Sequence, residues 1–99
     1  MRKVSALIAL SLLFSFAKAE VVYVKYIGSV DISDYSCSAI DSSFIHELCF
    51  SESNVKVIAL LNDTYYQYCG IESQLFNSWL DTQSKGSFYN KYIKGRYRC

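Results

Sequence analysis

Four cysteines constrain the fold of this chain more than any other feature of its sequence. Cys37, Cys49, Cys69 and Cys99 are 12, 20 and 30 positions apart in a chain of 99 residues, and the only histidine is His46. Zinc sites usually take their ligands in close-spaced pairs, whereas an even cysteine count in a small domain outside the cytosol is typical of disulfide bonds. We therefore expect two disulfides, no metal site and no cofactor. Three pairings remain open.

The first nineteen residues have the three-part pattern of an export signal. Arg2 and Lys3 precede an apolar run over residues 4–16, and Ala17-Lys18-Ala19 supplies the small-x-small pattern that signal peptidase reads. The run is shorter than the roughly 20 residues that a membrane-spanning helix needs. We expect residues 1–19 to be a signal peptide, the mature protein to be secreted or periplasmic, and no transmembrane span to remain after cleavage.

The 80 residues from Glu20 onward are enough for one small domain. This length excludes a two-domain enzyme, a dinucleotide-binding fold and a (β/α)8 barrel. A core of this size is modest, and each disulfide would add about 2–4 kcal/mol to its stability. The mature chain holds seven Lys and Arg against nine Asp and Glu, so it is not a polycation as a whole.

Strand patterns dominate the first half of the mature chain. Residues 20–41 form an N-terminal strand or irregular lead-in, because residues 20–25 suit an edge strand or a mobile arm and Ser, Asp and Gly follow. Strands are expected at 43–50, 55–61 and 64–69. Asn62 and Asp63 suit a tight hairpin between the last two strands. In the last strand Tyr66 and Tyr68 lie on one face, and Tyr65 and Gln67 on the other.

The hydrophobic period changes to that of a helix after Gly70. Apolar residues recur with helical spacing up to about Thr82, at Ile71, Leu75, Phe76, Trp79 and Leu80. A second short helix is expected over 88–93 and ends before Gly95. Strands followed by helices predict a small α+β domain. We expect a three-stranded antiparallel β-meander followed by two short C-terminal helices packed on the sheet, with two disulfides.

Three motifs resemble the KTSC domain, a family found at the C-terminus of some lysyl-tRNA synthetases and as stand-alone bacterial proteins. They are Ser42-Ser43-x-Ile45, Tyr66-x-Tyr68-x-Gly70-Ile71 and Ser84-x-Gly86-x-Phe88-Tyr89-Asn90-x-x-Ile93-x-x-x-Tyr97. The resemblance covers residues 42–97 and implies an α+β fold. It divides the chain into signal peptide 1–19, lead-in 20–41 and KTSC-like domain 42–99. The export signal and the cysteines indicate a secreted branch rather than a synthetase appendage.

The C-terminal segment is the candidate binding site. No acidic residue follows Asp81, whereas five basic residues do: Lys85, Lys91, Lys94, Arg96 and Arg98. Aromatic residues interleave with them, as a site for nucleic acid, an anionic glycan or a lipid headgroup would require. The alternative is an amphipathic helix whose aromatic stripe packs inward while its lysines are solvated. Residues 20–81 hold nine acidic and two basic residues, so the domain is strongly dipolar.

Two further features have both a binding and a structural interpretation. Tyr66 and Tyr68 share a strand face that would serve as a stacking platform, or they pack beneath the first helix near Trp79. The turn from Ser84 to Ser87 would hold an anion at a helix start, or it is a turn with an N-cap.

Enzyme chemistry has little support in the sequence. His46 and Cys49 are three positions apart on an expected strand and so lie on opposite faces, and the carboxylates are scattered. We expect a small exported, non-catalytic binding domain whose partner is an anionic polymer. The alternative is a structural envelope protein that binds another protein through its tyrosine-rich sheet. A small hydrolase or redox protein is the third class.

Overall fold

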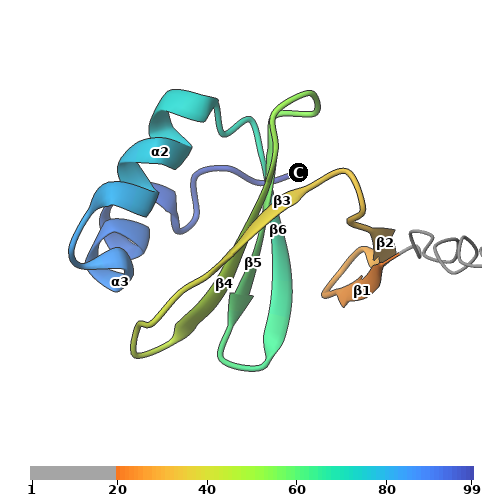
Figure 1. Cartoon of the computed structure of the whole chain (residues 1–99), viewed down its shortest axis with the longest axis horizontal. Coiled ribbons are helices and arrows are strands. Elements are labelled where there is room, and N and C mark those ends of the chain that lie inside the picture. Colours follow the sequence, from red (N-terminus) through yellow and green to blue (C-terminus); the bar gives the residue numbers. More distant parts are fainter. Residues whose placement is uncertain (1–19) are drawn as a thin grey trace, which may run out of the picture.

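The computed structural model describes residues 20–99, and the predicted signal peptide lies outside the described residues. Six strands come first: β1 (Val21–Val24), β2 (Gly28–Asp31), β3 (Ser36–Ala39), β4 (Ile45–Ser51), β5 (Lys56–Leu61) and β6 (Thr64–Cys69). Two helices follow. The first is α2 (Ser73–Asp81), and the second is α3 (Lys85–Phe88), which continues into the π-helical turn η2 (Tyr89–Ile93). The strands form one sheet in the order β2-β1-β6-β5-β4-β3 (Figure 1).

The α+β class and the two disulfides are confirmed, but the three-stranded meander is wrong as a description of the sheet. The expected strands are present as β4, β5 and β6, joined by antiparallel pairing. β3 extends this set beside β4. The β1–β2 hairpin joins the sheet at β6, on the edge away from β3, through a parallel bridge between Val24 and Tyr65. These three added strands are only four residues long, and β2 and β3 include glycine or serine, so the local signal of β2 and β3 is weak.

The helices cover one face of the sheet. Trp79, Ile71 and Phe76 are buried against Leu48 and Val57 of the sheet, as the helical spacing predicts. The Trp79 indole Nε1 donates a hydrogen bond to the Lys85 carbonyl at 3.1 Å, which joins α2 to the start of α3. Within residues 20–99 no helix is long and apolar enough to cross a bilayer.

The β1–β2 hairpin covers the opposite face. In Figure 1 this hairpin and the helices lie on opposite sides of the central strands. Val24 and Ile32 are buried against Cys49 and Ile58. The small domain therefore has three layers, with the helices on one face of the sheet and the hairpin on the other, and each face has its own apolar cluster.

One disulfide joins two neighbouring strands of the sheet, and the other attaches the C-terminal residue to the sheet. Cys37 is bonded to Cys49, directly opposite it in the β3–β4 register. Cys69 at the end of β6 is bonded to Cys99. The Cys69 N–H also donates to the Tyr97 carbonyl at 2.9 Å. The C-terminal residues that follow η2 therefore run beside the outer edge of β6.

Candidate binding groove

A groove of about 690 Å³ opens at the outer edge of β6. Strand β6 contributes Tyr66, Gln67 and Tyr68 to its lining. Two other segments complete it, the β1–β2 turn with Lys25, Tyr26 and Ile27, and the C-terminal stretch with Tyr89, Gly95, Tyr97, Arg98 and Cys99. Five tyrosines and two basic side chains thus share one cavity. Such a lining combines apolar rings with a few polar groups, which is the usual make-up of a ligand site.

Tyr66 and Tyr68 reach this groove from the helix-covered face. In the β5–β6 register they lie opposite Ala59 and Val57. Both rings are half-buried and pack against the cluster beneath the helices. The structure therefore shows packing for both tyrosines, and both also line the groove.

The Tyr68 hydroxyl is fixed by its contact with Tyr89. The two hydroxyl oxygens are 2.8 Å apart, and the rings meet edge to face. Burial, together with this hydrogen bond, raises the pKa of Tyr68 well above its ordinary value. Tyr68 thus stays protonated in the neutral range and presents an uncharged ring to the groove.

The five basic residues that were expected to form one binding site lie in different places in the structure. Arg98 lines the groove with Tyr66 and Tyr68. Lys85 lies in the first turn of α3, where its Nζ donates to the Thr82 carbonyl at 2.8 Å. Lys91, Lys94 and Arg96 are exposed on η2 and on the chain beyond it.

The groove also contains residues that the sequence did not single out, namely Lys25, Tyr26 and Ile27. They lie in the lead-in, for which only a strand or an irregular segment was expected. The one available signal was a β-rich stretch ending at Gly28, since glycine there permits the positive φ of 112° that the turn uses.

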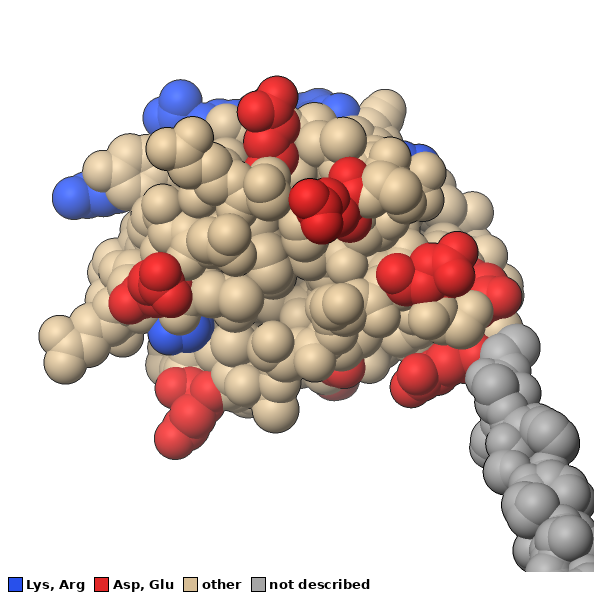
Figure 2. Space-filling view, turned by 45° about the horizontal axis from the view of Figure 1, so that its top comes forward, with Lys and Arg blue, Asp and Glu red and all other residues tan. Residues whose placement is uncertain are grey.

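Acidic and basic side chains occupy different parts of the surface. Figure 2 shows a face on which Asp and Glu are widely spread, while most of the visible Lys and Arg lie along its upper margin. This agrees with the sequence, in which five basic residues and no acidic residue follow Asp81.

A second, polar pocket of about 450 Å³ brings two of the resemblance motifs together. Ser42 and Ser43 line it with Ser84, Gly86 and their neighbours. A Cβ on Gly86 would lie 2.7 Å from the Phe44 ring, so glycine permits this close approach. The Ser84 hydroxyl accepts a hydrogen bond from the Ser87 N–H at 3.4 Å. The expected turn with an N-cap is therefore confirmed.

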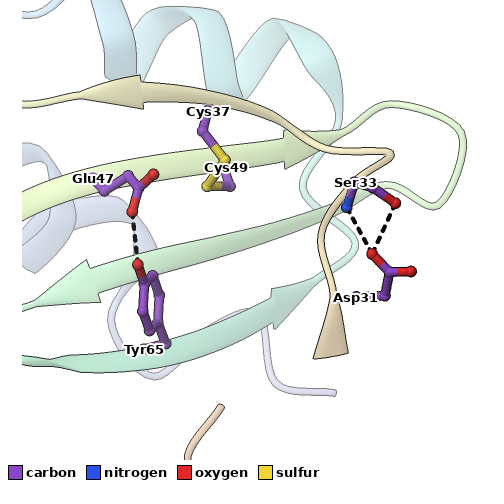
Figure 3. Close-up of a disulfide and its surroundings, with 6 residues drawn as sticks. All are labelled: Asp31, Ser33, Cys37, Glu47, Cys49 and Tyr65. Carbon is purple, nitrogen blue, oxygen red and sulfur yellow. Dashed lines mark hydrogen bonds between the residues drawn. A yellow bond between two sulfur atoms is a disulfide. The ribbon is translucent and has the colours of Figure 1, made fainter. Parts of the chain in front are cut away.

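The cluster around Cys37, Cys49 and Glu47 has the composition of a metal site (Figure 3). Its two sulfur atoms are bonded to each other, so neither is a thiolate that would bind zinc. The Glu47 carboxylate accepts a hydrogen bond from the Tyr65 hydroxyl at 2.8 Å. Burial and then this hydrogen bond raise the pKa of Tyr65 to about 12. The cluster is accounted for by structural bonds.

Asp31 shows the opposite effect in the same region (Figure 3). One of its carboxylate oxygens accepts hydrogen bonds from the Ser33 N–H at 2.9 Å and from the Ser33 hydroxyl at 2.8 Å. These bonds favour the charged form and lower the pKa of Asp31. They form a local turn that ends the hairpin.

Comparison with known proteins identifies one family. The KTSC domain family matches residues 41–97. Among solved structures, the chain is similar to a KTSC domain protein from Yersinia pestis, with a TM-score of 0.61 and 23% identity over 64% of this chain and 90% of that one. No curated protein matches the chain. At this identity the likeness shows a shared fold. The stretch 20–40 and Cys99 lie outside the family match.

Proposed function

The chain belongs to the KTSC domain family, and from this premise we propose that it is an exported, non-catalytic domain that binds an anionic polymer through residues 85–98. The observation that carries the proposal is the charge of this segment, which has five basic residues and no acidic one. Lys91, Lys94 and Arg96 are exposed. Arg98 extends the basic segment to the tyrosine-lined groove.

An acidic glycan is the partner class that we favour. Nucleic acids, acidic glycans and lipid headgroups all present anionic groups to such a segment. The export signal expected over residues 1–19 would take the domain to a compartment where nucleic acid is scarce. The carboxylates of residues 20–81 would repel a polyanion elsewhere on the surface and so favour contact at the basic segment.

A binding role also fits the state of the groups that could act as nucleophiles. All four cysteines are disulfide-bonded. His46 lies at the irregularity in β4 between Ile45 and Glu47, and the nearby Cys49 is bonded to Cys37. A thiolate–imidazole pair is therefore not available in this oxidised form.

The proposal is tested by titrating the protein with acidic glycans and with oligonucleotides at low and high salt. Removing three charges with Lys91→Gln, Lys94→Gln and Arg96→Gln should weaken binding at least tenfold and flatten its salt dependence, because fewer counterions are released. Lys56→Gln on β5 is the matched control and should leave affinity within about twofold. Absence of binding at low salt, or binding that salt does not change, would contradict the proposal.

A protein partner is the second candidate, and a specific observation favours it. Within residues 20–99, four of the five exposed large hydrophobic side chains lie on the β1–β2 hairpin, including Tyr23 at 71% and Tyr26 at 86% exposure. Exposed aromatic residues of this kind often mark protein interfaces. Binding that persists at high salt and is lost in Tyr23→Ser with Tyr26→Ser would support this candidate over the first.

A further inference from the structure

The backbone of Gln67 forms an open position on the outer edge of β6. The Tyr65 carbonyl accepts a hydrogen bond from the Lys25 N–H, and the Cys69 N–H donates to the Tyr97 carbonyl, both at 2.9 Å. Alternate residues of an antiparallel strand direct their backbone groups to the same side. The N–H and C=O of Gln67 therefore point outward, away from β5. Within residues 20–99, neither group makes a backbone hydrogen bond to the β1–β2 turn or to the C-terminal segment.

The groove surrounds this open position with rings and positive charge. Tyr66 and Tyr68, the neighbours of Gln67 along β6, supply half-buried rings. Lys25 and Arg98 come from the two segments that flank Gln67 along the edge, and both side chains are exposed. A ligand in the groove would thus meet one backbone donor, one backbone acceptor, aromatic surface and two cations.

We propose that this groove binds the non-reducing terminal uronic acid unit of an acidic glycan, an inference that rests on the proposed function and narrows its ligand. The sugar carboxylate accepts a hydrogen bond from the Gln67 N–H and pairs with Lys25 or Arg98. The hydroxyl on the ring carbon beside the carboxylate-bearing carbon, which is free at the non-reducing end of a 1,4-linked chain, donates to the Gln67 C=O. The apolar C–H face of the sugar packs against a tyrosine ring.

The chemistry of the open edge distinguishes this ligand from other polyanions. A sulfate ester or phosphodiester group itself offers only acceptor oxygens, so a polyanion held at the open position by such a group would leave the Gln67 C=O without a donor, at a cost once water is excluded. A terminal uronic acid with a free 4-hydroxyl offers an acceptor and a donor on the same edge of its ring. An extended peptide strand would need a longer free edge, since the chain already occupies the edge at Tyr65 and at Cys69.

The sharpest test removes the Gln67 N–H itself. Gln67→Pro deletes this donor without breaking a bond to β5, because the N–H points outward, and proline is tolerated at such edge positions. Gln67→Ala keeps the N–H and is the matched control. The ligands are trigalacturonate, a dextran sulfate fragment of similar charge and an oligothymidylate, each titrated by calorimetry against the mature disulfide-bonded protein.

We expect the unmodified protein to bind trigalacturonate at least tenfold more tightly than the other two ligands. Gln67→Pro should weaken trigalacturonate binding at least tenfold, Gln67→Ala less than threefold, and neither should change dextran sulfate binding by more than twofold. Should Gln67→Pro fail to fold, the amide signal of Gln67 in the NMR spectrum of the unmodified protein should shift on addition of trigalacturonate.

The outcomes separate this inference from the proposed function. Equal affinity for all three polyanions, with identical behaviour of the two Gln67 variants, would overturn the uronate site and leave the basic segment as a general polyanion site. An oligothymidylate that binds tightest and shifts the Gln67 amide would assign the groove to a nucleobase and overturn the uronate. Binding that depends on Gln67 but survives loss of Lys91, Lys94 and Arg96 would overturn only the proposed function.

Discussion

At the scale of single residues, two tyrosine hydroxyls determine what β6 presents on its two faces. The Tyr68 hydroxyl is hydrogen-bonded to the Tyr89 hydroxyl beneath the helices, and the Tyr65 hydroxyl is hydrogen-bonded to Glu47 on the hairpin-covered face. The two hydrogen bonds fix the side chains of Tyr65 and Tyr68, which precede and follow Gln67 along β6 and point to opposite faces of the sheet. The backbone of Gln67 remains directed at the groove, so the rigidity of its neighbours preorganises the open position.

The Tyr65–Glu47 bond predicts a loss of stability at alkaline pH. A tyrosine in the unfolded chain loses its proton near pH 10, whereas burial and Glu47 raise the pKa of Tyr65 to about 12 in the folded protein. Between about pH 10 and pH 12 the unfolded state therefore binds fewer protons, and rising pH favours unfolding. Urea unfolding at pH 9, 10 and 11 should show this decline, and Tyr65→Phe should make it shallower.

The exposed Tyr23 provides the control for that series. Tyr23→Phe should leave the decline between pH 9 and pH 11 as it is in the unmodified protein. Equal slopes for the unmodified protein and Tyr65→Phe would show that the Tyr65–Glu47 bond does not set the alkaline limit.

At the scale of elements, each disulfide joins the family fold to a segment outside it. Cys49 and Cys69 lie within the matched residues 41–97, whereas their partners Cys37 and Cys99 lie before and after them. The cysteine count was sufficient to predict two disulfides. The pairing was not predictable, because it depends on the β3–β4 register, and β3 reads Ser-Cys-Ser-Ala within a polar stretch that has no strand pattern.

The two disulfides should differ in their effect on binding more than in their effect on stability. Replacing either pair by alanine should lower the free energy of unfolding by about 3 kcal/mol, as expected for loops of 12 and 30 residues. Loss of Cys69–Cys99 frees the segment that carries Arg98, so trigalacturonate binding should fall at least fivefold. Urea unfolding and calorimetry of both double variants measure the two effects.

The Cys37–Cys49 variant is the internal control, because β3 lies at the opposite edge of the sheet from β2 and β1 and is separated from β6 by β4 and β5. Its affinity for trigalacturonate should stay within about twofold of the unmodified protein. Equal losses of affinity in both double variants would mean that general stability, rather than the position of the C-terminal segment, governs the groove.

At the scale of the whole molecule, local pattern predicted the centre of the fold and missed its periphery. The strands expected at 43–50, 55–61 and 64–69 and the helix expected to about Thr82 correspond to β4, β5, β6 and α2, because their apolar periodicity is strong. The strand expected at 20–25 is present as β1, but its expected edge position is wrong, since β1 lies between β2 and β6, and so is the alternative of a mobile arm. Its parallel partner is about 40 positions away, and no local signal reports such a pairing.

The same reason explains what was missed at the candidate site. Tyr66, Tyr68 and Arg98 could be proposed from composition and strand alternation alone. Lys25 and Tyr26 could not, because only the bridge between Val24 and Tyr65 brings the β1–β2 turn to the groove. Three of the eleven residues that line the groove therefore depend on this long-range pairing.

The three-layer arrangement predicts that the hairpin is part of the hydrophobic core rather than an appendage. Val24 and Ile32 are 0% and 2% exposed and cover Cys49 and Ile58. Burial of such a side chain contributes about 1.5–3 kcal/mol, so a chain of residues 36–99 should lose at least about 3 kcal/mol of unfolding free energy relative to 20–99. Urea unfolding of the two oxidised chains measures this difference.

Tyr23→Ser is the control, because it alters only the exposed side of β1 and should change the free energy of unfolding by less than about 0.5 kcal/mol. Equal stability of the two chains would mean that the sheet face around Ile58 tolerates water, and the hairpin would then serve the groove alone.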